Sequence, residues 1–151
     1  MPVVAGFARV IVRAVVAVVV LAGLAWAGVA VYRHQVYGAV FAESQLSVPV
    51  DAGDRFSLAV PTSGGSVGDS WTAAGDAAGL LGTPAERTRH DGLLDRVRDP
   101  LLGGGEGTKF FTYDASKAGS TSVTLSYCFQ GCDNPATQAR KRTVTWNVTV
   151  R

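Results

Sequence analysis

The sequence predicts a mainly β protein, an antiparallel β-sandwich that follows one transmembrane helix. Two observations support this fold class. Residues 14–32 form an uncharged apolar run, and the rest of the 151-residue chain repeatedly alternates apolar with polar side chains, as half-buried strands do. With 47% hydrophobic and 17% charged residues, a wholly disordered chain is excluded. The net charge of +2 is too small for a protein that binds nucleic acid through phosphate contacts, so no nucleic-acid partner is expected.

The apolar run has the length of a membrane span. A helix over residues 14–32 covers roughly 28 Å, close to the hydrocarbon thickness of a bilayer. Residues 10–12 extend the run beyond Arg13, whose long side chain can reach the interface. We therefore expect residues 10–32 to lie in the membrane and residues 1–33 to form a cytoplasmic tip and a signal anchor.

The charges beside this run predict its orientation. Arg9, Arg13 and the terminal amine outnumber Arg33 on the other side, which places the N-terminus in the cytoplasm. The protein is then a single-pass protein of the cytoplasmic membrane, with its C-terminal domain outside. Residues 25–27 (Ala-Trp-Ala) have the form of a signal-peptidase site, and cleavage after Ala27 would release a secreted protein. The apolar run continues beyond that site, which favours an uncleaved anchor.

After a predicted juxtamembrane linker, residues 34–45, the pattern changes to short strands separated by turns rich in glycine. We expect these strands to build an immunoglobulin-like sandwich over residues 46–151, because about a hundred residues suit a seven-strand sandwich of that type. Leu93–Arg98 is ambiguous between a strand and one turn of helix. The clearest predicted strands are Leu46–Val50, Phe56–Val60, Phe110–Tyr113, Thr121–Tyr127 and Thr143–Val150.

The chain has two cysteines, Cys128 and Cys132. Outside the cytoplasm, a local disulfide that closes this short loop is the expected state. A redox-active pair usually has C-x-x-C spacing, and two thiolates are too few for a closed zinc site unless His34 or His90 joins them. No cofactor or metal is expected.

The turns and strands resemble the chagasin family of cysteine-peptidase inhibitors. Val50–Phe56 matches the family's entry into its first strand, and Val60–Gly65 keeps the Pro-Thr-hydroxyl-Gly centre of its first binding loop. Leu102–Thr108 is glycine-rich before Phe111–Tyr113, as the second loop is, and Ala118–Tyr127 is similar to the family's next strand. The resemblance implies an immunoglobulin-like sandwich whose loops enter the cleft of a papain-type peptidase.

Two of the three loops depart from the family's pattern. The first loop has Val60 and Gly65 where the family has Asn and an aromatic residue, and the third has Phe129-Gln130-Gly131 where the family has Arg-Pro-aromatic. Phe129 is the candidate apolar anchor of the third loop. The partner-binding residues implied by the resemblance are Pro61, Thr62, Ser63, Gly64, Gly103, Gly104, Gly105, Gly107, Phe129 and Gln130.

These observations favour a binding protein over an enzyme. Ser, His and Asp all occur, but no pattern places His90 beside a nucleophile. A second hypothesis remains beside inhibition: a non-inhibitory, single-pass accessory subunit whose sandwich docks onto an envelope membrane-protein complex. The altered loop motifs favour this alternative, since the anchor and sandwich patterns are intact.

Overall fold

The structure is a computed structural model that describes residues 3–63, 68–76, 79–90 and 106–151. The chain divides into two compact units, Met1–Val36 and Tyr37–Arg151. The first unit belongs to one long helix, α1 (Val3–Tyr37). Among the described residues, the strands and the 3-10 helix η2 all belong to the second unit.

Helix α1 is apolar around its whole circumference over residues 14–32. Most side chains of this stretch are exposed, including Leu21 at 65% and Trp26 at 75%. Within the described residues, it is the helix long and apolar enough to cross a membrane, and its place near the N-terminus also suits a signal sequence.

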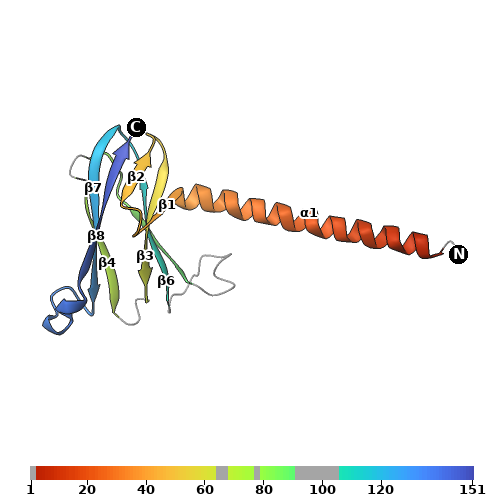
Figure 1. Cartoon of the computed structure of the whole chain (residues 1–151). Coiled ribbons are helices and arrows are strands. Elements are labelled where there is room, and N and C mark those ends of the chain that lie inside the picture. Colours follow the sequence, from red (N-terminus) through yellow and green to blue (C-terminus); the bar gives the residue numbers. More distant parts are fainter. Residues whose placement is uncertain (1–2, 64–67, 77–78, 91–105) are drawn as a thin grey trace. The chain divides into compact units, whose positions relative to one another are not determined.

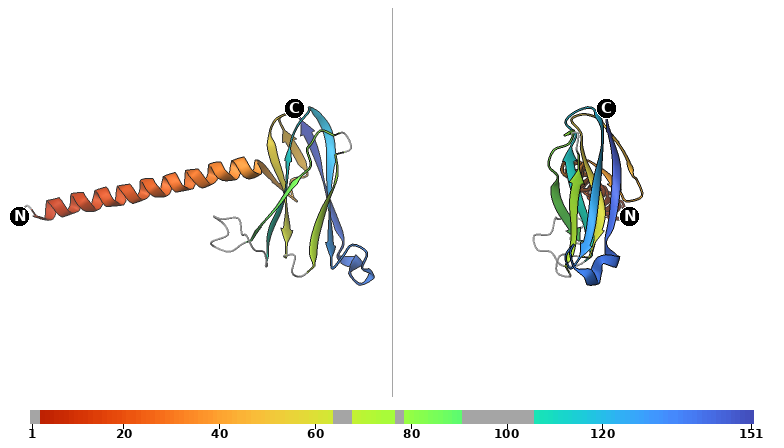
Figure 2. Two further views of the ribbon diagram at one scale, coloured as in Figure 1. Left: turned by 180° about the vertical axis from the view of Figure 1, so that it is seen from behind. Right: turned by 90° about the vertical axis from the view of Figure 1, so that its left-hand side faces the viewer.

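The second unit is a sandwich of two four-stranded sheets (Figures 1 and 2), which confirms the predicted mainly β, immunoglobulin-like fold. Sheet A has the order β1-β3-β6-β5, and sheet B has the order β2-β8-β7-β4. The bounds are β1 Ala39–Ala42, β2 Ser47–Val50, β3 Arg55–Thr62, β4 Asp69–Gly75, β5 Ala85–His90, β6 Gly107–Asp114, β7 Gly119–Phe129, η2 Pro135–Arg140 and β8 Arg142–Val150.

The core lies between the two sheets and uses the alternation that the sequence displays. The inward side chains of β3 and those of Val123 and Leu125 on β7 are buried, whereas Ser120 and Ser122 on the other face of β7 are exposed. The largest core side chains are Trp146, Phe56, Phe111, Leu58 and Leu125.

Three features differ from the sequence prediction. Ala39–Ala42 forms strand β1 instead of a linker, and it pairs in parallel with Phe56–Ala59 of β3. Strand β2 also pairs in parallel, with β8, so the sandwich is antiparallel in its interior and parallel along one side. The edge strands β4 and β5 were not predicted. Leu93–Arg98 lies outside the described residues.

Candidate functional site

The strand register gathers the predicted binding segments at one end of the sandwich. Thr62 pairs with Gly107, Asp69 with Phe129, and Tyr127 with Arg142. The end of β3, the starts of β4 and β6 and the β7–β8 connection therefore share one end (Figure 1), here called the loop end. The described residues of the prediction that lie there are Pro61, Thr62, Ser63, Gly107, Phe129 and Gln130. Gly64, Gly103, Gly104 and Gly105 lie outside the described residues.

Asp69, which the sequence analysis did not select, holds the first loop in place. Its Oδ2 accepts hydrogen bonds from the Thr62 hydroxyl at 3.0 Å and from the main-chain N–H of Ser63. The indole N–H of the buried Trp71 donates to the Pro61 carbonyl at 2.9 Å. The loop is therefore fixed where it leaves β3. A carboxylate seven residues after Thr62, at the start of the next strand, is the only sequence signal for this arrangement.

The start of β6 is held by contacts to both sheets. Gly107 is buried, and the ammonium of Lys109 is 2.8 Å from the Glu86 carboxylate of β5. The same ammonium donates to the Trp71 carbonyl of β4 at 3.3 Å. Lys109 thus connects sheet A to sheet B just below the loop end.

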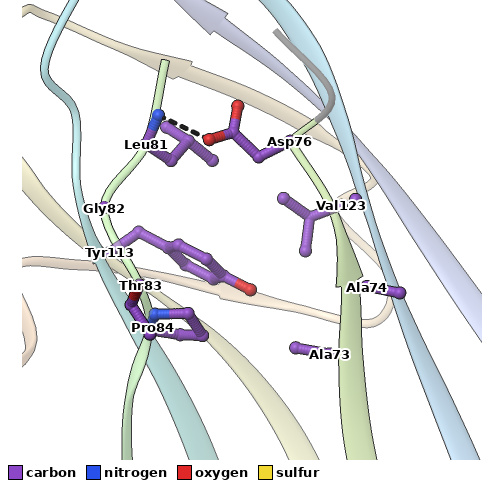
Figure 3. A pocket seen from close by; sticks show the side chains of 10 residues that line it. Ala73, Ala74, Asp76, Leu81, Gly82, Thr83, Pro84, Tyr113 and Val123 are labelled. Carbon is purple, nitrogen blue, oxygen red and sulfur yellow. Dashed lines mark hydrogen bonds between the residues drawn. The ribbon is translucent and has the colours of Figure 1, made fainter. Parts of the chain in front are cut away.

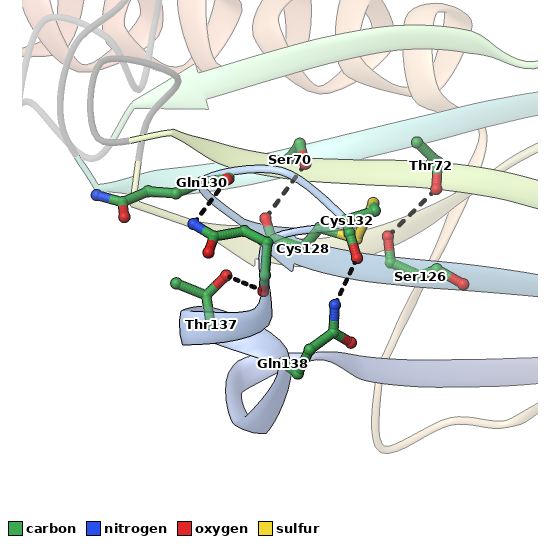
Figure 4. The surroundings of a disulfide bond; sticks show 9 residues. Ser70, Thr72, Ser126, Cys128, Gln130, Cys132, Thr137 and Gln138 are labelled. Carbon is green, nitrogen blue, oxygen red and sulfur yellow. Dashed lines mark hydrogen bonds between the residues drawn. A yellow bond between two sulfur atoms is a disulfide. The ribbon is translucent and has the colours of Figure 1, made fainter.

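The third loop is closed by the predicted disulfide between Cys128 and Cys132 (Figure 4). Cys128 is 1% exposed. Asn134 begins η2 by accepting the Ala136 N–H at 3.0 Å, as a helix N-cap does. Gln138 donates from η2 to the Cys132 carbonyl at 2.9 Å. These bonds join the disulfide loop and η2 into one ordered projection after β7.

Phe129 does not project from this loop as an uncovered tip. It is half-buried, and the Arg140 guanidinium lies 4.7 Å from its ring centre. The alternation along β7 explains this position, because Phe129 has the same parity as the core residues Val123 and Leu125. The exposed tip is instead Gln130, which adopts the left-handed conformation with φ 52°.

A hollow of about 540 Å³ opens at the loop end. On one side the Arg142 guanidinium lies 4.9 Å from the Trp71 ring centre and 5.5 Å from that of Tyr127. It also pairs with Glu43 at 3.1 Å. Burial and the Asp69 carboxylate raise the pKa of the Tyr127 hydroxyl, so it stays a neutral hydrogen-bonding group. The hollow is lined by Pro61, Thr62, Ser63, Asp69, Glu106, Gly107, Tyr127, Arg140 and Arg142.

The chemistry of this end suits binding. It offers hydroxyl groups, main-chain groups and charges of both signs around the Tyr127 ring. Among the described residues, no three His, Cys, Asp or Glu side chains gather where they could hold a metal ion.

Comparison with solved structures supports the fold of this domain. No protein-family model and no curated protein sequence matches the chain. The cysteine protease inhibitor EhICP2 from Entamoeba histolytica superposes with a TM-score of 0.54 at 14% identity, over 75% of this chain and 95% of its own. The solution structure of amebosin gives a TM-score of 0.54 at 17% identity, over 75% and 97%. The likeness shows that these two proteins have the same fold as the β-sandwich of this chain.

Proposed function

We propose that this chain is a membrane-anchored, extracytoplasmic inhibitor of papain-type cysteine peptidases that inserts its loop end into the active-site cleft. One observation carries the proposal. Thr62–Ser63, Gly107 and Phe129–Gln130 meet at one end of a sandwich whose fold is also that of a cysteine protease inhibitor. The chain acts by binding and carries out no reaction of its own.

Rigid loops favour such a binding mode. The bonds from Asp69 fix Thr62 and Ser63, and the disulfide fixes the segment beside Gln130, before a partner arrives. Preorganisation lowers the entropy lost on binding. The main-chain N–H and C=O of Gln130 already bond to Gly68 and Asn134, so this exposed residue offers its side-chain amide. The Phe129 ring with its covering Arg140 offers an apolar and cationic contact.

The anchor and its orientation are part of the proposal. The apolar helix α1 suits a membrane span, and a disulfide is typical of extracytoplasmic domains. The Gln45→Cys variant should react with a membrane-impermeant maleimide in intact cells, because Gln45 follows the anchor and is exposed. Labelling only after lysis contradicts the orientation, and a mature protein that begins at Gly28 contradicts the anchor.

Inhibition is tested with the full-length chain in detergent micelles and papain. We expect reversible inhibition at micromolar chain, with the inhibitor uncut on a gel. Phe129→Ala should weaken inhibition by about 1–3 kcal/mol, which is roughly 5- to 150-fold in the inhibition constant. Ser122→Ala, on the exposed outer face of β7, is the matched control and should inhibit like the parent chain.

The second candidate function is the accessory subunit of an envelope membrane-protein complex. The observation that favours it is the position of Phe129, which lies half-buried under Arg140 instead of projecting. Purification of the tagged full-length chain from its own membranes separates the two functions. A stoichiometric membrane complex, together with no inhibition of several papain-type peptidases, favours the accessory subunit. Recovery of an exported peptidase favours the inhibitor.

A further inference from the structure

Three of the four lateral strands carry features that discourage further strand pairing. Strand β5 has the charged residues Glu86, Arg87 and Arg89, β2 has Pro49, and β1 has four residues. Such features are the usual protection of sheet edges. The fourth lateral strand, β4, lacks them over Thr72–Gly75, where its sequence is Thr-Ala-Ala-Gly.

The register shows which main-chain groups β4 turns outward. The Gly68 carbonyl accepts from Gln130, and the Asp76 N–H donates to the Ser122 carbonyl, so even-numbered residues bond to β7. The Trp71 carbonyl faces the opposite way, since it accepts from Lys109 of sheet A. Ala73 and Gly75 have the same parity as Trp71. Within the described part of the chain, no hydrogen bond reaches the outward N–H and C=O of Ala73.

A pocket of about 240 Å³ lies directly beside these groups (Figure 3). Its walls include the apolar side chains of Leu81, Pro84 and Val123, and the side chain at position 73 is only a methyl group. Asp76 and Thr83 also line it, and the Asp76 carboxylate accepts hydrogen bonds from the main-chain N–H groups of residues 80 and 81. The Tyr113 ring forms part of the lining. Burial, with Asp76 and Glu86 nearby, raises the pKa of Tyr113 to about 12, so this hydroxyl stays neutral and the pocket gains no charge from it.

We propose that the outer edge of β4 binds an extended segment of another polypeptide as an added strand, with one apolar side chain seated in the pocket beside Ala73. In this mode main-chain hydrogen bonds supply affinity and a side-chain pocket supplies selectivity. The outward groups of Ala73 supply one donor and one acceptor. This site is on the lateral edge of the sandwich and is separate from the loop end.

The pocket also argues against a second copy of this chain as the occupant. If two β4 strands paired with each other, the inward side chain that each offers at the pocket would be Ala73 or the glycine at 75. Neither fills a space of about 240 Å³. A partner strand with a Leu, Ile or Phe at its inward position fits it better.

The test is a selection of displayed random octapeptides against the full-length chain in lipid nanodiscs. We expect selected peptides to share one apolar position and to protect the Ala73 amide from hydrogen exchange. Ala73→Pro removes the outward N–H without breaking the ladder to β7, and should weaken peptide binding at least tenfold. Ala73→Leu fills the pocket and should weaken it similarly. Thr72→Leu adds apolar volume to an exposed side chain on the opposite face of β4, outside the lining of the pocket, and should bind like the parent chain.

Several outcomes overturn the proposal. These are a selection that yields no binding peptide, binding that leaves the Ala73 amide unprotected, and binding that Ala73→Leu does not change. A dimer of the chain that protects the Ala73 amide without peptide assigns the edge to a second copy instead. Because Ala73→Leu keeps the main chain unchanged, the test holds even if Ala73→Pro does not fold.

Discussion

The outer faces of the two sheets differ in how far their side chains are exposed to solvent. On sheet B the outward side chains of β7 that precede the disulfide, such as Ser122 and Ser126, are exposed or half-buried. On sheet A the outward side chains of Ser57, Phe110 and Thr112 are all at most 6% exposed. Period-two alternation therefore identifies the inward face of a strand, but it does not show whether the outward face meets water.

Two residues contribute to the cover on sheet A: Tyr37, the last residue of α1, and Arg89 of β5, whose guanidinium lies 5.2 Å from the Phe110 ring centre. The Tyr37 ring lies 4.5 Å from that of Phe110, and its carbonyl accepts a 2.6 Å hydrogen bond from the Ser57 hydroxyl. Thr112 completes the set at 2.8 Å from Ser57. The next residue, Gly38, has φ +62° and sits so near the Arg55 carbonyl that a Cβ would collide with it. The point where the chain enters the sandwich is thus fixed.

Two adjacent phenylalanines provide the largest test of this comparison. Phe111 is 0% exposed in the core, and Phe111→Ala should lower the free energy of unfolding by about 3–5 kcal/mol. Phe110 points to the outer face, and because Tyr37 covers it, Phe110→Ala should still cost about 1.5–3 kcal/mol. Urea titration followed by tryptophan fluorescence measures both. A loss below about 0.5 kcal/mol for Phe110→Ala, typical of surface sites, shows that the face is solvated.

Two serines provide the next test. Ser57→Ala removes the hydroxyl that joins the Tyr37 carbonyl to Thr112. Since these groups are buried, the free energy of unfolding should fall by about 1–3 kcal/mol. Ser122→Ala, on the exposed outer face of sheet B, should change it by less than about 0.5 kcal/mol. Equal effects from both substitutions contradict the difference between the faces.

The sequence pattern predicted those strands whose inward side chains are large. It identified β3, β7 and β8 because each alternates bulky apolar residues with small or polar ones. It also identified β2, as an edge strand with its proline, and β6, in which Phe110 and Phe111 are adjacent. It missed β4, in which the large inward Trp71 is followed by the small Ala73. It also missed β5, whose Glu86 forms an ion pair with Lys109 of β6. Strand β1 was missed because Ala39–Ala42 has no alternation of its own.

The candidate site was predicted in part for a related reason. Motif resemblance identified Thr62, Gly107 and Phe129, and the strand register then brought them together. Asp69 and the cover of Phe129 by Arg140 depend on contacts between segments. No local pattern encodes such contacts, so only the folded structure shows them.

The disulfide provides a smaller test. It concerns Cys128, a buried residue on the outer face of sheet B. Cys128 points outward but is 1% exposed, because the loop it closes with Cys132 folds over it. The closed loop is so short that reduction should cost no more than about 2 kcal/mol. We expect the melting temperature of the reduced chain to fall by no more than about 8 °C, while the Lys141 amide, bonded to Gln138 of η2, exchanges faster. Global unfolding on reduction contradicts this local role.

The smallest expected effect comes from the ion pair at the margin of the covered area. Arg55 and Asp114 pair across β3 and β6, 2.8 Å apart. They are next in register on the same outer face to Ser57 and Thr112, but both side chains are exposed, at 46% and 63%.

The hydrogen bond from Arg55 lowers the pKa of Asp114 below its ordinary value of 3.8. Any stability from the pair is therefore present above that value and is lost as the pH falls through the lowered pKa. Since exposed pairs contribute little and are screened by salt, Asp114→Asn at neutral pH should shift the urea midpoint less than Ser57→Ala does, and the shift should vanish in molar salt. A larger, salt-independent shift contradicts this expectation. It would mean that the Arg55–Asp114 pair is shielded from solvent in the same way as the Ser57–Thr112 pair.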